Sequence, residues 1–283
     1  MHFGIAFANV GAYSDPDHAV TLARLAEQHG FESLWTVEHP VVPQGYESEY
    51  PYSREGRMPG PEQSPFPDPL TWLTWVGAHT TTLRLGTGIL LLPLRSPVVL
   101  AKECATVDHL TGGRMILGIG VGWLREEFDA IGVPWDDRAA HTDDSVHALR
   151  ALWEQSPATY AGSHTSFTDV YSHPKPVNGT IPVVVGGHSK PAARRAGRLG
   201  DGFFPADHRS LPELLPVMRA AATEAGRDPD AIEITTGGRG DVDTLKALAD
   251  SGVTRWVISP PAMHPAKLPD AIARYADEVI AKV

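Results

Sequence analysis

The sequence places a carboxylate next to an imidazole directly after a short apolar run. Glu38 and His39 follow Ser33–Val37, which has the length and composition of a buried strand. An imidazole can donate or accept a proton near neutral pH, and a neighbouring carboxylate can orient it. A loop histidine can equally bond only to backbone, and the pattern leaves both interpretations open. We take Glu38 and His39 as the candidate catalytic pair.

Two glycines interrupt the next apolar run. Gly86 and Gly88 lie within Leu83–Leu92, which otherwise reads as one buried strand. Glycine packs nothing and loses backbone entropy in a strand. The two glycines therefore indicate a bulge, or a place where another group approaches the backbone closely. Room for a bulky neighbour is the alternative explanation.

Glycines also follow two later apolar runs. Gly118–Gly122 ends one run, and Gly186 and Gly187 end another, where Ser189 can cap a helix that begins at Lys190. Free backbone N–H groups in such turns, together with a helix N-terminus, can bind an anion. The alternatives are a flexible turn and an ordinary capped helix. The Gly-x-Gly-x-Gly spacing is not a dinucleotide fingerprint, because that motif belongs to the first strand–helix turn.

These candidate residues are positioned by strand-like runs that alternate with amphipathic, helix-like runs. The predicted strands are His2–Ala8, Ser33–Val37, Leu83–Leu92, Arg114–Gly120, Ile181–Val185, Gly202–Phe204, Ile232–Thr236 and Arg255–Ser259. The predicted helices are Asp17–His29, Pro69–Thr81, Pro97–Leu110, His141–Glu154, Lys190–Leu199, Leu211–Ala225, Val242–Ser251 and Pro265–Ile280.

Strict alternation of this kind predicts parallel strands joined by right-handed crossovers. The fold class is therefore α/β, as a single (β/α)8 TIM barrel domain over residues 1–283, with an open doubly wound sheet as the competitor. Long insertions are expected after the second strand, at Glu38–Pro67, and between the fourth and fifth strands, where Thr159–Thr180 could form a hairpin. In such barrels the active site lies at the carboxyl ends of the strands.

Composition argues against several classes of function. The formal net charge is −10, from 34 acidic and 24 basic residues, which argues against nucleic-acid binding. The single cysteine, Cys104, allows no internal disulfide. We expect a cytoplasmic protein without membrane contact, because no signal peptide and no long apolar span stand out. No metal site is expected, since His141 and His147 do not share a helical face.

Three segments resemble the bacterial luciferase-like oxidoreductases. They are Ser33–His39 (SLWTVEH), Leu85–Trp123 (LGTGILLLPLRSPVVLAKECATVDHLTGGRMILGIGVGW) and Pro182–Phe203 (PVVVGGHSKPAARRAGRLGDGF). The resemblance spans most of the chain, from His2 to about Asp207. It implies a (β/α)8 barrel that binds coenzyme F420 or, alternatively, FMN.

The resemblance also implies roles for individual residues. His39 would assist proton movement beside the cofactor ring with Glu38 orienting it, and a cis peptide bond that supports the ring would fall at Gly88-Ile89. The phosphate end would lie near the glycine-rich turns. The implied cofactor-binding residues are Glu38, Thr87, Gly88, Ile89, Leu91, Val121, Gly122, Gly186, Gly187, Ser189 and Lys190, and the implied substrate-pocket residues are Phe7 and Trp123.

One departure from the family pattern limits the substrate. A sugar-phosphate dehydrogenase of this family has a catalytic glutamate where this chain has Trp123, and tryptophan cannot relay a proton. The leading hypothesis is an F420-dependent oxidoreductase that transfers a hydride to or from a small organic molecule. The alternatives are an FMN-dependent monooxygenase that uses O2 and a reductase partner, and a flavin-binding protein without turnover. Members of the family usually form homodimers.

Overall fold

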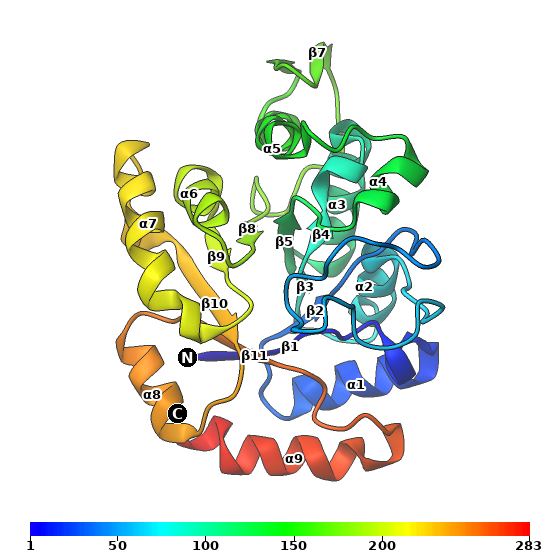
Figure 1. Ribbon diagram of the computed structural model, residues 1–283, viewed down its shortest axis with the longest axis vertical. Helices are drawn as coiled ribbons and strands as arrows, with labels where there is room; N and C mark the ends of the chain where they lie inside the picture. Colours follow the sequence, from blue (N-terminus) through cyan, green and yellow to red (C-terminus); the bar gives the residue numbers. More distant parts are fainter.

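A closed barrel of parallel strands forms the centre of the molecule. The computed structural model describes residues 1–283, and Figure 1 shows the helices surrounding the central strands. The strands of the main sheet are β1 (His2–Ile5), β2 (Ser33–Thr36), β3 (Arg84–Thr87), β4 (Leu90–Leu91), β5 (Met115–Gly120), β8 (Val183–Gly186), β9 (Gly202–Phe204), β10 (Glu233–Gly237) and β11 (Arg255–Ile258).

Strand pairing closes the sheet on itself. β1 pairs in parallel with both β2 and β11, with His2 opposite Arg255, and β3 pairs with β5. The sheet has nine strands, but β3 and β4 are two parts of one interrupted strand. The barrel wall therefore consists of eight strands. The predicted (β/α)8 barrel is confirmed, and the open doubly wound sheet is excluded because it would have two unpaired edges.

The helices follow the strands in the predicted order. They are α1 (Pro16–Gln28), α2 (Pro69–Gly77), α3 (Pro97–Thr111), α4 (Arg125–Ile131), α5 (Arg138–Glu154), α6 (Lys190–Leu199), α7 (Leu211–Glu224), α8 (Val242–Asp250) and α9 (Leu268–Glu278). Proline occupies the first turn of α1, α2 and α3, where its missing N–H costs no helical hydrogen bond. The sequence analysis missed α4, because seven residues are too few to show a clear helical period.

The two insertions differ in structure. Between Thr36 and Pro69 the chain forms neither helix nor strand, whereas the insertion after α5 contains an antiparallel hairpin of β6 (Ala158–Ala161) and β7 (Ser166–Val170). Figure 1 shows this hairpin projecting beyond α5. No helix of the molecule is both long and apolar enough to span a bilayer.

Trp35 fills the interior of the barrel and explains several glycines. Its side chain is fully buried. A Cβ atom added at Gly86 would lie 2.6 Å from the indole ring, and one at Gly4 would lie 2.9 Å from the indole nitrogen. Gly88 is confined in the same way, since its added Cβ would lie 3.2 Å from both Trp35 and Phe204. The bulky-neighbour explanation for the glycines of the third strand is therefore correct, although it is not the whole explanation.

The predicted strand Leu83–Leu92 is in fact interrupted between β3 and β4. The peptide bond between Gly88 and Ile89 at this interruption is cis, as the resemblance implies. The Ile89 side chain lies against two neighbouring strands, where a Cβ on Gly120 or on Gly186 would come within 2.4 Å of it. A bulge and close packing are thus both present, so one continuous strand was the wrong expectation.

Candidate active site

Glu38 and His39 occupy the carboxyl end of β2, but their side chains have different partners. Glu38 accepts a hydrogen bond from the backbone N–H of Leu91 at 2.5 Å and from Nε of Arg95 at 2.9 Å. His39 instead bonds to Glu127. The prediction that Glu38 orients His39 is therefore wrong. Consecutive residues in an extended segment point to opposite sides, so these two side chains face different neighbours.

The buried Glu38 carboxylate is part of an ion-pair cluster that extends to the surface. Arg95 pairs with it and also donates to Asp68 Oδ2 at 2.6 Å, while Glu103 lies 3.7 Å from the same guanidinium. Burial raises the pKa of the Glu38 carboxyl, and the positive charge of Arg95 offsets part of that rise. Leu91 contributes to this cluster through its backbone, while its own side chain is buried. The cluster fixes Glu38 at the strand end.

His39 is held by one carboxylate and two aromatic rings. Its Nδ1 lies 3.1 Å from Oε2 of Glu127, the third residue of α4. Its ring makes edge contacts with Phe66 at 5.5 Å and Trp123 at 5.7 Å between ring centroids. The other ring nitrogen, Nε2, has no hydrogen-bond partner within the protein. His39 therefore has one nitrogen engaged and one free for a reacting molecule.

The loop of residues 38–67 forms an aromatic cover over this region. Tyr46 and Tyr50 contact Trp123 with ring centroids 5.6 and 5.0 Å away, and Tyr52 contacts His188 at 4.7 Å. Burial raises the pKa of Tyr50 to about 12, so its hydroxyl stays neutral. The loop aromatics thus pack onto residues that follow β5 and β8, and residues 38–67 are called the lid below because they cover these strand ends.

α4 fastens this lid through Glu126. Its Oε1 accepts from the backbone N–H groups of Glu47 at 2.6 Å and Ser48 at 3.0 Å, and its Oε2 accepts from the Ser48 hydroxyl at 2.6 Å. Burial by itself would raise the pKa of Glu126, but these donors lower it to about 2. The carboxylate is therefore ionised near neutral pH and can accept all three hydrogen bonds.

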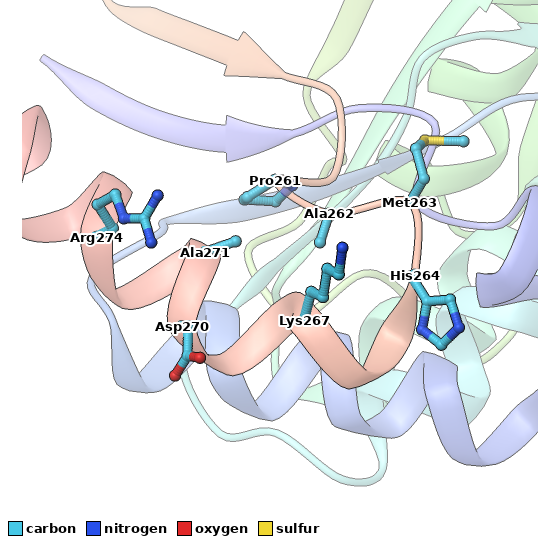
Figure 2. Close-up of a pocket in the computed structure, with 8 residues that line it drawn as sticks. All are labelled: Pro261, Ala262, Met263, His264, Lys267, Asp270, Ala271 and Arg274. Carbon is cyan, nitrogen blue, oxygen red and sulfur yellow. The ribbon is translucent and has the colours of Figure 1, made fainter.

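The protein has two hollows of note, of which one lies beside Glu38 and His39. The first measures about 270 Å³ and is lined by Glu38, His39, Pro40, Phe66, Pro67, Asp68, Pro69 and Arg95. The second measures about 550 Å³ and lies between the chain after β11 and one face of α9. Figure 2 shows Asp270 and Arg274 on α9, and Lys267 in the short 3-10 turn just before it. The second hollow contains none of the predicted site residues, so the first is the one that belongs to the candidate active site.

The two glycine-rich strand ends lie side by side. β5 pairs with β8 so that Ile119 is opposite Val185. The backbone N–H groups of Val121 and Gly122 have no acceptor within the protein, and neither do those of His188 and Ser189. Four free N–H groups at adjacent strand ends can bind an anion, and the α6 N-terminus adds the positive end of its dipole.

Individual glycines also have packing roles that the sequence did not reveal. Gly122 has φ +84°, and an added Cβ would lie 2.6 Å from Phe128. Gly187 has φ +124° and donates its N–H to the Phe204 carbonyl at 3.2 Å, so that N–H is not free for a ligand. Gly186 makes room for Ile89. These glycines shape the strand ends, whereas the neighbouring amides are the ones available to an anion.

The remaining predicted residues vary in accessibility. Ser189 caps α6 by accepting from Ala192 N, and Lys190 pairs with Glu213 at 3.0 Å. Thr87 is buried, and its hydroxyl donates to the Gly118 carbonyl at 2.6 Å. Phe7 is 44% exposed, with φ +55°, just after β1. The Ser189 and Thr87 hydroxyls are thus engaged within the protein, while Phe7 is exposed at the end of a strand.

Four side chains that contact the candidate site or its loop were not predicted from the sequence: Arg95, Asp68, Glu126 and Glu127. The adjacent glutamates follow the glycine-rich end of β5 by only a few residues, and a carboxylate pair at that distance from a strand end is a usable signal. Arg95 carried no such signal, because its partners lie 27 and 57 residues away in sequence.

Comparison with known proteins identifies the family. A family model described as luciferase-like monooxygenase matches residues 1–274. The chain belongs to the luciferase-like monooxygenase family. This membership makes it an oxidoreductase and confirms the resemblance carried by the three motif segments.

Relatives of this luciferase-like protein include enzymes and uncharacterized proteins. An uncharacterized protein of Mycobacterium tuberculosis is 31% identical over 288 residues and covers 100% of this chain and 99% of its own. An F420-dependent glucose-6-phosphate dehydrogenase of Mycolicibacterium gilvum is 29% identical over 278 residues, with 93% of this chain and 77% of that protein covered. The crystal structure of a Streptomyces bottropensis monooxygenase superimposes with a TM-score of 0.78 at 23% identity, covering 99% of each chain, which supports the fold.

Proposed function

We propose that this luciferase-like protein is an F420-dependent oxidoreductase acting on a small organic substrate at the carboxyl face of the barrel. The observation that carries the proposal is His39, which has an unbonded Nε2, lines a hollow, and lies beside the covering aromatic loop. A relative that uses F420, the dehydrogenase of Mycolicibacterium gilvum, supports the choice of cofactor.

The residues at the strand ends fit an anionic, ring-bearing cofactor. The free N–H groups of Val121, Gly122, His188 and Ser189 would hold its phosphate, and Gly88 and Ile89 would contact its ring. The bound deazaflavin would supply a carbon that accepts or donates a hydride.

The protein's own groups would supply binding, orientation and proton movement. His39 would donate or accept the proton that accompanies hydride transfer, because the residue lines the hollow and its Nε2 has no hydrogen-bond partner within the protein. Trp123 and Tyr50 would form an apolar wall, and the 38–67 loop would keep bulk water from the reacting atoms. Glu38 would act as a fixed charge, since Arg95 holds it away from His39.

An FMN-dependent monooxygenase is the second candidate, because the matching family is described as luciferase-like monooxygenase. Such an enzyme would need O2 and a supply of reduced flavin. The polar groups described above also serve this chemistry, so cofactor choice separates the two functions.

The deciding experiment is a parallel titration of the purified protein with oxidised F420 and with FMN, followed by ligand fluorescence. Saturable, tighter binding of F420 is expected. Preference for FMN would favour the monooxygenase, and failure to bind either would overturn both candidates. With F420 bound, His39→Ala should lower turnover by about 10²–10⁴ with little change in cofactor affinity. His147→Ala, which removes an exposed histidine on α5, is the matched control.

A further inference from the structure

Glu127 is a fully buried carboxylate whose hydrogen-bond partners come from the lid and the catalytic histidine. Its side chain is 1% exposed. Oε1 accepts from the backbone N–H of Val41 at 3.2 Å, and Oε2 lies 3.1 Å from Nδ1 of His39. A buried carboxylate is costly unless donors surround it. Both contacts are therefore needed to compensate the burial of this charge.

The contact with Glu127 determines which nitrogen of the His39 imidazole carries the proton. An ionised carboxylate can only accept hydrogen bonds, so the proton of the His39–Glu127 contact must reside on Nδ1. In a neutral imidazole the other nitrogen is then an acceptor. We infer that Glu127 is a positioning residue that fixes His39 in the Nδ1–H tautomer and so presents Nε2 to the substrate as a proton acceptor.

The surrounding residues leave Glu127 as the group that sets this tautomer. Glu38 is engaged by Arg95 and the Leu91 amide. Glu126 is engaged by Glu47 and Ser48 of the loop. Phe66 and Trp123 contact the His39 ring at interplanar angles of 80° and 82°, which restricts its rotation. The ring is thus confined by aromatic edges and oriented by one carboxylate.

This arrangement has a chemical consequence, which rests on the proposed function. When a substrate hydroxyl loses its proton, the O–H bond breaks and an Nε2–H bond forms, so His39 becomes a cation. The negative charge of Glu127, 3.1 Å from Nδ1, stabilises that cation. In the reverse direction the same cation returns its proton from Nε2. Glu127 would therefore affect the reaction through His39 without touching the substrate.

Because Glu127 also holds Val41, it links the lid to the histidine. Val41 lies two residues beyond His39, at the start of the 38–67 loop. A displacement of this part of the loop would disturb both bonds of one carboxylate. This anchor is separate from the bonds of Glu126, which hold the loop at Glu47 and Ser48, so loosening the loop there should leave the contacts of Glu127 with Val41 and His39 in place.

The tautomer is measurable in the unliganded protein by two-bond ¹H–¹⁵N NMR of protein labelled with ¹⁵N-histidine. Spectra would be recorded at mildly alkaline pH, which favours the neutral imidazole. The His39 signals are identified by their loss in His39→Gln. Wild type should show a protonated Nδ1 and an unprotonated Nε2. A ring protonated on Nε2, or on both nitrogens, would overturn the inference before any variant is made.

Variants separate the action of Glu127 from general support of the loop. Glu127→Ala should abolish the fixed Nδ1–H state of His39, giving a mixture of tautomers. Glu126→Ala is the matched control, since the adjacent residue binds the same loop but not His39. It should leave the His39 signals unchanged. Equal effects of both variants would contradict the specific role of Glu127.

Steady-state kinetics provide a second test of the role of Glu127 once a substrate is known. Glu127→Ala should lower kcat by about 10- to 100-fold, within the range expected for an impaired acid–base group, with KM changed less than threefold. A change confined to KM would overturn the positioning role. The NMR experiment needs neither cofactor nor substrate, so it tests the role of Glu127 even if the protein does not use F420. Conversely, a different His39 tautomer would contradict the role of Glu127 without affecting the result of the cofactor titration.

Discussion

The Glu38 carboxylate is paired with the guanidinium of Arg95, which lies 57 residues further along the chain and donates from Nε at 2.9 Å. The pair joins the end of β2 to the segment that follows β4. Glu38 is 2% exposed at its side chain, so its charge depends on this single cation and on the Leu91 amide. Breaking the pair should therefore affect both stability and the shape of the hollow.

Replacing Arg95 with leucine should destabilise the protein by about 3–5 kcal/mol, because it leaves a buried carboxylate without its cation. Urea unfolding at neutral pH measures the loss. Adding Glu38→Gln to this variant should recover part of it, since the amide carries no charge. Arg209→Leu removes an exposed partner of Asp207 and should cost about 0–1 kcal/mol. If Arg95→Leu lowers the free energy of unfolding no more than Arg209→Leu does, the expectation is contradicted.

Replacing Glu126 with alanine should loosen the lid. Three hydrogen bonds to Glu47 and Ser48 are lost, so tryptic cleavage at Arg54 and Arg57 should accelerate about tenfold, which corresponds to about 1.4 kcal/mol. Global stability should change little, because the loop contains no helix or strand. Asp129→Ala, an exposed change on the same helix, should leave cleavage unchanged. Equal cleavage of Glu126→Ala and wild type would show that other contacts hold the loop.

Two glycines next to α4 offer a matched comparison of backbone and packing effects. Gly122 and Gly132 have similar positive φ values, +84° and +80°, but an added Cβ meets Phe128 at 2.6 Å only at Gly122. Gly132→Ala should cost about 1–2 kcal/mol from the left-handed backbone alone. Gly122→Ala should cost at least 1 kcal/mol more, because the fully buried Phe128 must move. Thermal unfolding measures both, and equal costs would mean that Phe128 moves freely.

The ion pair between Arg255, at the start of β11, and Glu32 should make the stability of the protein depend on pH. Arg255 is fully buried and donates to Glu32 at 2.8 and 2.9 Å, and Glu233 lies 3.2 Å away. Burial alone would raise the pKa of Glu32, but Arg255 lowers it below its ordinary 4.5. This contribution to stability is therefore present above about pH 4.5 and is lost as pH falls through the lowered value.

Arg255→Met tests this dependence by urea unfolding at several pH values. The variant should be about 3 kcal/mol less stable than wild type near neutral pH, and the difference should narrow below pH 4.5 as Glu32 becomes protonated. Arg219→Met, at an exposed pair with Asp230, should show a small difference at every pH. A constant gap for Arg255→Met would indicate that Glu32 does not carry the effect. Cofactor affinity should not change, because Arg255 begins β11 at the end opposite the site.

Much of the architecture could be predicted because it depends on local periodicity. α6 and β9 have the predicted bounds, and most other strands and helices differ at their ends; the exceptions are the interrupted third strand and the missed α4. Prolines, caps and glycines mark those ends by chemistry that acts within a few residues. The pair Glu38–His39 and the glycine-rich strand ends were found for the same reason, since they directly follow recognisable strands.

The amino-acid sequence by itself determined the alternation of elements, the strand ends where chemistry is possible, and the types of side chain present there. Only the tertiary structure decided which side chains meet. Glu127 reaches His39 across 88 residues of sequence, and Trp35 rather than a ligand accounts for Gly86. Pairings of this kind depend on strand order, on barrel closure and on the direction of each side chain. Those properties arise from long-range packing, which leaves no periodic trace along the chain.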